Sequence, residues 1–183
     1  MQAVHGGYVT ITTLRPTGDN HVGCARSPVG AANYTAVYEE SPDDDSSYVY
    51  RNSVGEVYDL YSFPASGIPS AAVIAYIRIY FRLKTGDATL GGAGATKLKT
   101  HDALYNGEWQ SSAAAYTDFY TEYTLNPNTS AAWTVSEVDA ILAGVRLYAA
   151  SGSYYGRVTQ MWITISWTVP CAAGPQIIGL TRW

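Results

Sequence analysis

The densest cluster of chemically useful side chains in this sequence is acidic. Carboxylate oxygens are hard ligands that could hold a calcium ion. The spacing of this cluster lacks the alternating ligand order of a calcium-binding loop, and Pro42 with its serine neighbours is typical of a turn. We therefore favour a solvated acidic turn over a calcium site at Asp43–Asp45. The five carboxylates of the cluster are Glu39, Glu40, Asp43, Asp44 and Asp45.

The sequence signatures of common catalytic sites are missing. The histidines His5, His21 and His101 are scattered over predicted loops or termini, so a three-histidine metal site would require a coincidence of folding. No Gly-x-Ser-x-Gly, His-Glu-x-x-His, Walker or Cys-x-x-Cys motif occurs. Few acidic residues fall on predicted strands, which argues against the paired carboxylates of a glycoside hydrolase. We expect no enzyme, cofactor or metal site.

Aromatic side chains are the strongest compositional signal. The 183 residues include 16 tyrosines, and only 14% are charged. Tyrosine suits a surface that touches another subunit or a sugar ring, although strands also simply favour aromatic residues. If the ligand is a glycan, the candidate stacking residues are Trp109, Tyr154 and Tyr155. Contacts with a neighbouring subunit are expected from the apolar C-terminal tail, at Ile177, Ile178, Leu180 and Trp183.

Charge and hydropathy exclude two classes of partner. The formal net charge is −4, so the chain lacks the basic excess that binds a phosphate backbone, and we expect no nucleic acid partner. The longest apolar stretch, residues 71–77, is far too short to span a bilayer, so we expect no membrane partner. Residues 1–7 have neither the basic nor the apolar region of a signal peptide, which predicts that the chain folds in the cytoplasm where it is made.

The two cysteines, Cys24 and Cys171, allow a single disulfide. If the fold brought the two ends of the chain together, closing so long a loop could contribute on the order of 4 kcal/mol. Reduced thiols are the alternative. We favour them, because a chain without a signal peptide is expected to stay in a reducing compartment.

Alternating hydrophobicity predicts a chain made mostly of strands. The clearest strand is Val73–Lys84, with tyrosines and basic residues on one face and a core face of Ala75, Ile77, Ile79, Phe81 and Leu83. This pattern is typical of an antiparallel sheet that is packed on one face only. Residues 17–32 are expected to form a loop or irregular arm, and the glycine-rich residues 85–95 a hairpin or loop. Further strands are predicted at residues 8–14, 33–40, 47–51, 56–63, 96–100, 107–110, 116–125, 145–150 and 157–169.

One short α-helix, at about residues 134–143, interrupts the strands. Thr134 and Glu137 have the spacing of a capping box, with Trp133 as the first half of a hydrophobic staple. Gly144 stands where a left-handed C-cap would end the helix. The residues expected to face the core are Val138, Ile141 and Leu142.

These elements predict an all-β fold. The many strands, the single short helix in a connection and the absence of a βαβ rhythm favour an antiparallel β-sandwich of jelly-roll type. Residues 1–33 are expected to form an N-terminal strand and irregular arm, and residues 34–169 the sandwich domain. Residues 170–183 form a tail that could contact a neighbouring subunit.

Several short motifs follow one another in order along the chain. They are Glu40-Ser41-Pro42-Asp43-Asp44-Asp45, Ser47-Tyr48-Val49, Asp59-Leu60-Tyr61, Asn126-Pro127-Asn128, Ala132-Trp133-Thr134, Glu137-Val138, Ala143-Gly144-Val145-Arg146-Leu147 and Val158-Thr159-Gln160. In this combination, residues 34–168 resemble a recurrent β-sandwich domain of tailed-phage and phage-like virion proteins. Ala131-Ala132 departs from that pattern, in which glycine and a small polar residue precede the tryptophan.

The resemblance implies a structural or attachment module in a virion. We expect a virion structural protein, either a capsid decoration or a tail component, that associates with copies of itself and binds a major capsid or tail protein. A trimer is expected by analogy with decoration proteins. Two alternatives remain open: a carbohydrate-binding attachment module, and an extracellular filament subunit, which would ordinarily need an export signal.

Overall fold

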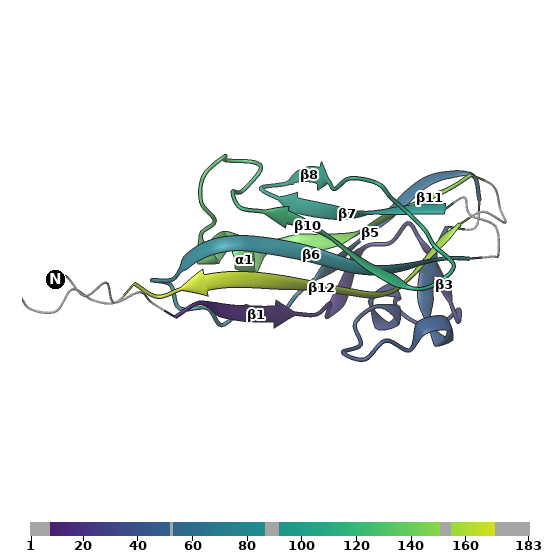
Figure 1. Cartoon of the computed structure of the whole chain (residues 1–183), viewed down its shortest axis with the longest axis horizontal. Helices are drawn as coiled ribbons and strands as arrows, with labels where there is room; N and C mark the ends of the chain where they lie inside the picture. The colour runs from purple at the N-terminus through teal and green to yellow at the C-terminus, as the bar shows by residue number, and fades with distance from the viewer. Residues whose placement is uncertain (1–7, 52, 87–91, 151–154, 171–183) are drawn as a thin grey trace, which may run out of the picture.

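The computed structural model describes residues 8–51, 53–86, 92–150 and 155–170. They form two antiparallel sheets packed face to face and one short helix, α1 (Val135–Ala140), which precedes a strand of the second sheet (Figure 1). The predicted all-β sandwich of jelly-roll type with a single short α-helix is therefore confirmed. Within the described part of the chain, no helix is both long and apolar enough to cross a membrane.

The first sheet, sheet A, is built on two long strands, β6 (Val73–Thr85) and β12 (Gly156–Thr168), which pair along most of their length. Its strand order is β10-β6-β12-β4-β3, and β1 also pairs with β12. The other strands of sheet A are β1 (Thr10–Leu14), β3 (Ala25–Ser27), β4 (Tyr48–Tyr50) and β10 (Thr117–Tyr123).

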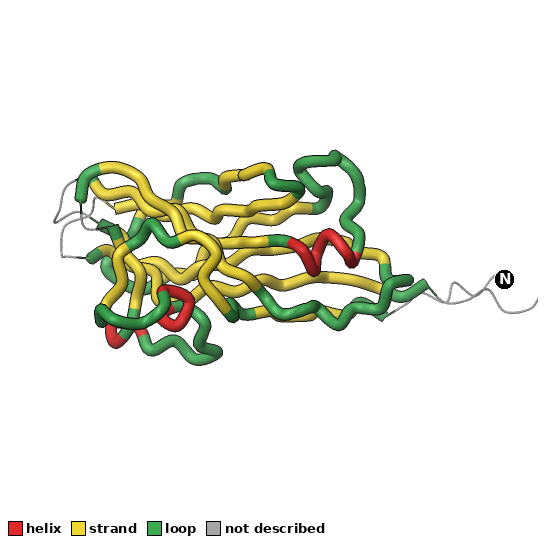
Figure 2. Tube along the Cα trace, turned by 180° about the vertical axis from the view of Figure 1, so that it is seen from behind, coloured by secondary structure: helices red, strands yellow, loops and turns green. Residues whose placement is uncertain are grey.

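The second sheet, sheet B, has the order β2-β5-β11-β7-β8, with β9 also paired to β7. Two 3-10 helices, Asn33–Ala36 and Asp44–Ser46, lie at the end of the molecule opposite α1 (Figure 2). The strands of sheet B are β2 (Gly18–His21), β5 (Gly55–Ser62), β7 (Gly92–Thr100), β8 (Ala103–Asn106), β9 (Gln110–Ser111) and β11 (Leu142–Ala149).

The core lies between the two sheets, and the alternation predicted for β6 supplies much of it. Its side chains at positions 77, 79, 81 and 83 are fully or almost fully buried. Ala75 is an exception, because it is exposed and Ile74 is buried instead. The pairing of β6 with β12 shifts register between Ser166 and Trp167, which lie opposite Tyr76 and Ile74. This bulge inserts Ala75 as an extra residue and reverses the alternation there.

The N-terminal region is more ordered than predicted. Residues 17–32 were expected to form a loop, yet they contain β2 and β3, and β2 pairs with β5 in sheet B. Because β1 pairs with β12 in sheet A, the described part of residues 1–33 contributes strands to both sheets. It lies within the sandwich rather than beside it.

The strand predicted at residues 33–40 is wrong, because this segment begins as the 3-10 helix Asn33–Ala36. The carboxylate of Asp19 accepts hydrogen bonds from the backbone N–H groups of Asn33 and Tyr34, at 2.9 and 2.7 Å. The Asn33 side chain is itself buried and donates to the carbonyl of Cys24. These contacts fix a turn where the local pattern alone favours a strand.

The start of α1 is confirmed, but its predicted end is wrong. Thr134 accepts from the backbone N–H of Glu137 at 3.2 Å, and the Glu137 carboxylate accepts from the N–H of Thr134 at 2.8 Å, which forms the capping box. The helix ends at Ala140, since Ile141 is extended, and Leu142 is the first residue of β11. Gly144 lies inside β11 and not at a left-handed C-cap. A Cβ there would approach the Asp59 carbonyl oxygen to 1.8 Å.

Candidate functional site

Three strands of sheet B direct side chains into one hollow on its outer face. Glu56 of β5 lies opposite Tyr148 of β11, which in turn lies opposite Ala93 of β7. Trp109 precedes β9 and completes the wall. The four side chains line an open groove of about 370 Å³. Because Ala93 carries only a methyl group, the space between the larger residues stays unfilled.

The indole of Trp109 is held in position from one side. The guanidinium carbon of Arg146 lies 4.1 Å from the centroid of the Trp109 ring. Glu56 fixes this guanidinium with two hydrogen bonds, Nε to Oε1 at 2.9 Å and Nη2 to Oε2 at 2.5 Å. A bidentate pair restricts the orientation of the guanidinium, so the group that contacts the Trp109 ring is itself held in place. Trp109 nevertheless remains 40% exposed.

The groove combines an apolar surface with a few polar groups. The Tyr148 ring meets Trp109 nearly edge-on, with centroids 6.3 Å apart and planes at 66°. Glu56 and Arg146 neutralise each other, so the wall of the groove carries little net charge. Both carboxylate oxygens of Glu56 are engaged by Arg146, which makes the group a positioned acceptor rather than a free base. The arrangement suits binding of a ligand with a flat apolar face and a polar rim.

A second row of side chains flanks this groove on the same face. Tyr58 lies opposite Arg146 in the register of β5 and β11. His21 stacks on Tyr58 with centroids 4.3 Å apart, and the Lys97 ammonium lies 4.7 Å from the same ring. Burial, and secondarily the charge of Arg146, lowers the pKa of Lys97. Its ammonium also donates to the Asn106 side chain at 2.6 Å.

The outer face of sheet A also carries aromatic rings, but they cover one another. Tyr120, Tyr80 and Trp162 form a row in register across β10, β6 and β12. The rings of Tyr80 and Trp162 are stacked at 4.8 Å and 6°, and the Arg15 guanidinium lies over Trp162 at 5.4 Å. An open hollow of about 620 Å³ lies beside Trp162, with mostly polar walls that include Glu40. Trp162 is the ring of this row that lines the hollow, and it is already covered by Tyr80 and Arg15, so the hollow is less suited to stacking a planar ligand.

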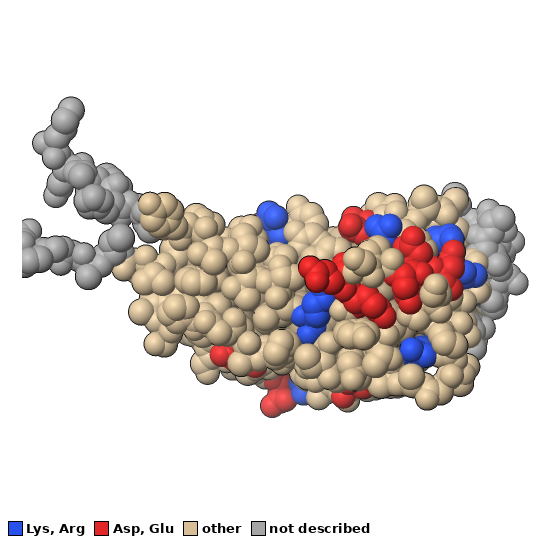
Figure 3. Space-filling view, turned by 90° about the horizontal axis from the view of Figure 1, so that it is seen from below, with Lys and Arg blue, Asp and Glu red and all other residues tan. Residues whose placement is uncertain are grey.

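Two carboxylates of the acidic cluster, those of Asp44 and Asp45, are paired with basic side chains of the same chain. The carboxylate of Asp44 pairs with Arg82 at 3.4 Å, and that of Asp45 pairs with Lys84 at 2.6 Å and with Arg157 at 3.1 Å. On the face of the molecule drawn in Figure 3, acidic and basic side chains intermingle over one half of the surface. Among residues 8–51, 53–86, 92–150 and 155–170, no group of three or more His, Cys, Asp or Glu side chains is arranged to hold a metal ion. The predicted turn is present and contains the 3-10 helix Asp44–Ser46.

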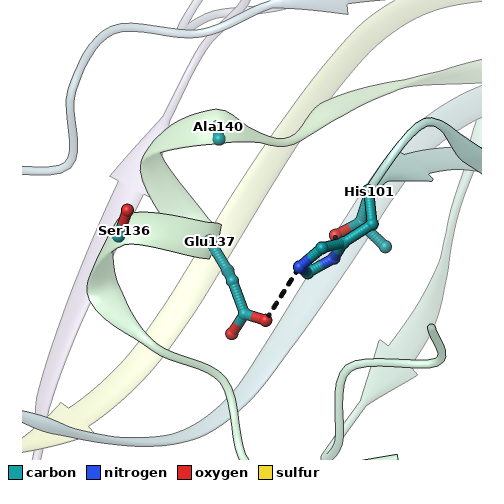
Figure 4. Close-up of a pocket in the computed structure, with 5 residues that line it drawn as sticks. His101, Ser136, Glu137 and Ala140 are labelled. Carbon is teal, nitrogen blue, oxygen red and sulfur yellow. Dashed lines mark hydrogen bonds and ion pairs between the residues drawn. The ribbon is translucent and has the colours of Figure 1, made fainter. Parts of the chain in front are cut away.

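A smaller pocket of about 230 Å³ lies beside α1 (Figure 4). Glu137 points towards His101, with Oε1 and Nε2 3.4 Å apart, while Ser136 is turned away from both. The carboxylate of Glu137 also accepts from Thr134 and from the Asn126 side chain. Its bonds therefore serve the helix cap, and we assign the pocket a structural role.

The predicted site residues lie in different places. Trp109 lines the groove on sheet B, whereas Tyr155 packs against Tyr50 at one end of sheet A, with centroids 5.3 Å apart. Cys24 is buried, and its prospective partner Cys171 lies outside the described residues. So do the other predicted contact residues, Tyr154, Ile177, Ile178, Leu180 and Trp183.

Sequence reasoning missed the other members of the groove, Glu56, Ala93, Arg146 and Tyr148. Alternation along β11 was a usable signal, because it separates Arg146 and Tyr148 from the core residues of the same strand. Glu56 and Ala93 could be added only by knowing that β5 and β7 lie on either side of β11. The local sequence pattern does not reveal which strands are neighbours.

No protein-family model matches the sequence, and no characterised protein matches it. Among solved structures, the chain is similar to a family 11 carbohydrate-binding module from Clostridium thermocellum in complex with a β-1,3-1,4-mixed-linked tetrasaccharide. That likeness has 11% identity and a TM-score of 0.41, over 89% of this chain and 92% of that one. The CBM22-1 xylan-binding domain from Paenibacillus barcinonensis Xyn10C is similar at 9% identity and a TM-score of 0.41, over 93% and 100% of the two chains. At such identities the likeness concerns only the β-sandwich fold, so a function has to rest on the geometry of the groove.

Proposed function

We propose that this chain is a non-catalytic carbohydrate-binding module whose ligand stacks on Trp109. The observation that carries the proposal is an exposed indole that is fixed by the Arg146–Glu56 pair and lines an open groove. A sugar ring has one face of C–H groups and a rim of hydroxyls. It therefore matches a wall that is aromatic over most of its area and polar at a few points.

Each residue of the groove has a separate part in this proposal. Trp109 supplies the apolar surface for the sugar ring, and Arg146 and Glu56 hold that surface still, which reduces the entropy lost on binding. We expect the Tyr148 hydroxyl, and the remaining acceptor capacity of the Glu56 carboxylate, to bond with sugar hydroxyls. Ala93 leaves the space that the ring enters.

The charge of the groove favours a neutral glycan. Glu56 and Arg146 form a closed ion pair, so an anionic sugar would have to break that pair to gain a cation of its own. A neutral sugar needs only hydroxyl contacts and the stacked ring. We therefore propose neutral polysaccharides or oligosaccharides as the ligand class.

The test begins with a glycan array probed with the intact chain, followed by calorimetric titration with the best ligand. Trp109→Ala should weaken binding about tenfold or more, since an aromatic stacking contact contributes on the order of 1.5 kcal/mol. Tyr120→Ala is the matched control, because it removes an exposed ring from the other sheet and should leave the affinity unchanged. An array without hits, or equal losses in the two variants, would overturn the proposal.

A self-assembling virion component, either a capsid decoration or a tail protein, is the second candidate function. The observation that favours it is an exposed apolar surface at one end of sheet A, which includes Tyr8, Val9 and Ile11. Solvent-exposed surfaces of this kind mark contacts with other proteins. Immunogold electron microscopy of particles from the source should label a head or a tail if this candidate is right, and leave the particles unlabelled if it is wrong.

A further inference from the structure

One end of sheet A presents an apolar surface, here called the end patch. Its side chains come from the two residues before β1 and the start of that strand, the start of β6 and the residue after β12. These segments are neighbours, since Thr10 pairs with Trp167 and Val73 with Thr168. On the face shown in Figure 3, charged side chains gather over the opposite half of the molecule. The exposed members of the end patch are Tyr8, Val9, Ile11, Val73 and Val169.

The end patch borders a strand edge that lacks the usual protection. Within the described residues, β1 pairs with β12 alone, so its other edge carries backbone groups that face outwards. Edge strands are normally guarded by charged residues, proline or a bulge. The sequence of β1, Thr-Ile-Thr-Thr-Leu, contains no charged residue and no proline. This edge can accept another strand.

We propose that the end patch and the edge of β1 are covered by residues 171–183 of a second copy of the chain. This segment follows Val169 and Pro170, so it leaves the sandwich at the end patch itself. Fully extended, it reaches about 40 Å, and pairing along β1 needs about 17 Å. Arg182 is its one charged side chain. Its apolar side chains include Ile177, Ile178, Leu180 and Trp183.

The strand directions favour a second copy over the same chain. Because β12 runs antiparallel to β1, a segment that turned back along β1 of its own chain would be parallel to it. Parallel pairing is slightly less stable per residue than antiparallel pairing, and every strand pair within the described part of sheet A is antiparallel. A second copy can approach in the antiparallel direction, and reciprocal exchange closes a two-fold symmetric dimer.

The first test is the molar mass in solution, measured by light scattering after size-exclusion chromatography over a concentration series. The full chain should be a dimer. Deletion of residues 171–183 and Ile11→Lys should each give a folded monomer, with circular dichroism as the check on folding. Leu104→Lys, at an exposed apolar residue of sheet B, is the matched control and should remain a dimer. A monomeric full chain, or a dimer that survives both changes, would overturn the proposal.

The second test separates exchange between copies from docking within one chain. The deletion variant keeps the end patch and the Ile11→Lys variant keeps the C-terminal segment, so mixing the two should restore one of the two exchanged contacts. We expect a heterodimer, detected by native mass spectrometry, and docking within one chain would give none. Because Trp109 lies on the other sheet, glycan binding should be the same in all these variants. The two proposals can therefore fail independently.

Discussion

At the scale of single residues, the carboxylate of Asp59 is buried and surrounded by hydrogen-bond donors from several segments of the chain. It is fully buried and accepts four hydrogen bonds. The donors are the backbone N–H groups of Gly23 and Cys24, each at 2.8 Å, the Asn33 side chain at 2.8 Å and the Tyr61 hydroxyl at 2.9 Å. Asp59 thereby ties β5 to the segment after β2 and to the first 3-10 helix.

Asp59→Asn should destabilise the fold strongly. The amide that replaces one carboxylate oxygen would face N–H donors, and bonds to a charged acceptor are worth about 1.5–3 kcal/mol each. We expect the free energy of unfolding in urea to fall by about 3 kcal/mol. Asp102→Asn, at a highly exposed carboxylate, is the control and should change it little. A similar result for both variants would contradict this role of Asp59.

The role of Asp59 could not be predicted from the sequence, because three of its four donors come from the distant positions 23, 24 and 33. The same is true of the groove. Trp109 stands out in the sequence as a large aromatic residue, but its backing residue Arg146 and the clamp Glu56 lie on strands that only the fold brings together. Local sequence patterns identify Trp109 as a large aromatic residue but not the contacts with Arg146 and Glu56 that hold it in position.

At the scale of elements, the capping box fixes where α1 begins. Thr134→Ala should lower the free energy of unfolding by about 1 kcal/mol, because the backbone N–H of Glu137 loses its acceptor. Ser136→Ala, one residue before Glu137 and outside the capping box, should have a much smaller effect. Urea denaturation of the two variants measures the difference. Equal losses would show that the cap does not contribute.

The acidic turn clamps the 3-10 helix Asp44–Ser46 to sheet A through Asp45. Hydrogen bonding from Lys84, with smaller contributions from Tyr116 and Arg157, lowers the pKa of Asp45 below its ordinary value of 3.8. A depressed pKa in the folded state means that this stabilisation is present above about pH 4. It is lost as the pH falls through the lower, folded pKa.

Asp45→Asn should therefore remove part of the acid sensitivity of the fold. The variant should be slightly less stable than the parent at pH 7, and its stability should fall less steeply between pH 5 and pH 3. Urea midpoints at several pH values measure both effects. Because the Asp45 side chain is half exposed, the difference should be small and should shrink with added salt. Parallel pH profiles would contradict the clamp.

Elements with an intrinsic pattern were predictable, and elements set by distant contacts were not. The strands β6 and β12 follow from alternation alone, and the start of α1 follows from its cap. The strand β8 was missed because its hairpin with β7 turns through His101 and Asp102, which both have positive φ values. That is a type I′ turn without the glycine that usually signals one. The segment at residues 33–40 was misjudged because Asp19 holds it from outside.

At the scale of the whole molecule, the two sheets carry different surfaces. The outer face of sheet B holds a neutral groove with an exposed indole, and that of sheet A holds stacked rings, an ion-paired turn and the end patch. Composition alone predicted that aromatic faces replace charge on this protein. It could not predict which rings cover one another and which stay exposed, because that depends on the strand order of the two sheets.

The measurement that tests the central claim most directly is a titration of the labelled protein with its best glycan, followed by the tryptophan side-chain N–H signals in NMR spectra. The signals of Trp109 and Trp162 are assigned from the spectra of the Trp109→Phe and Trp162→Phe variants, each of which lacks one of them. We predict that the Trp109 signal shifts with saturation and that the Trp162 signal, beside the polar hollow of sheet A, does not move. A shift of Trp162 with Trp109 unchanged would place the ligand on the other sheet and contradict the proposed function of the groove.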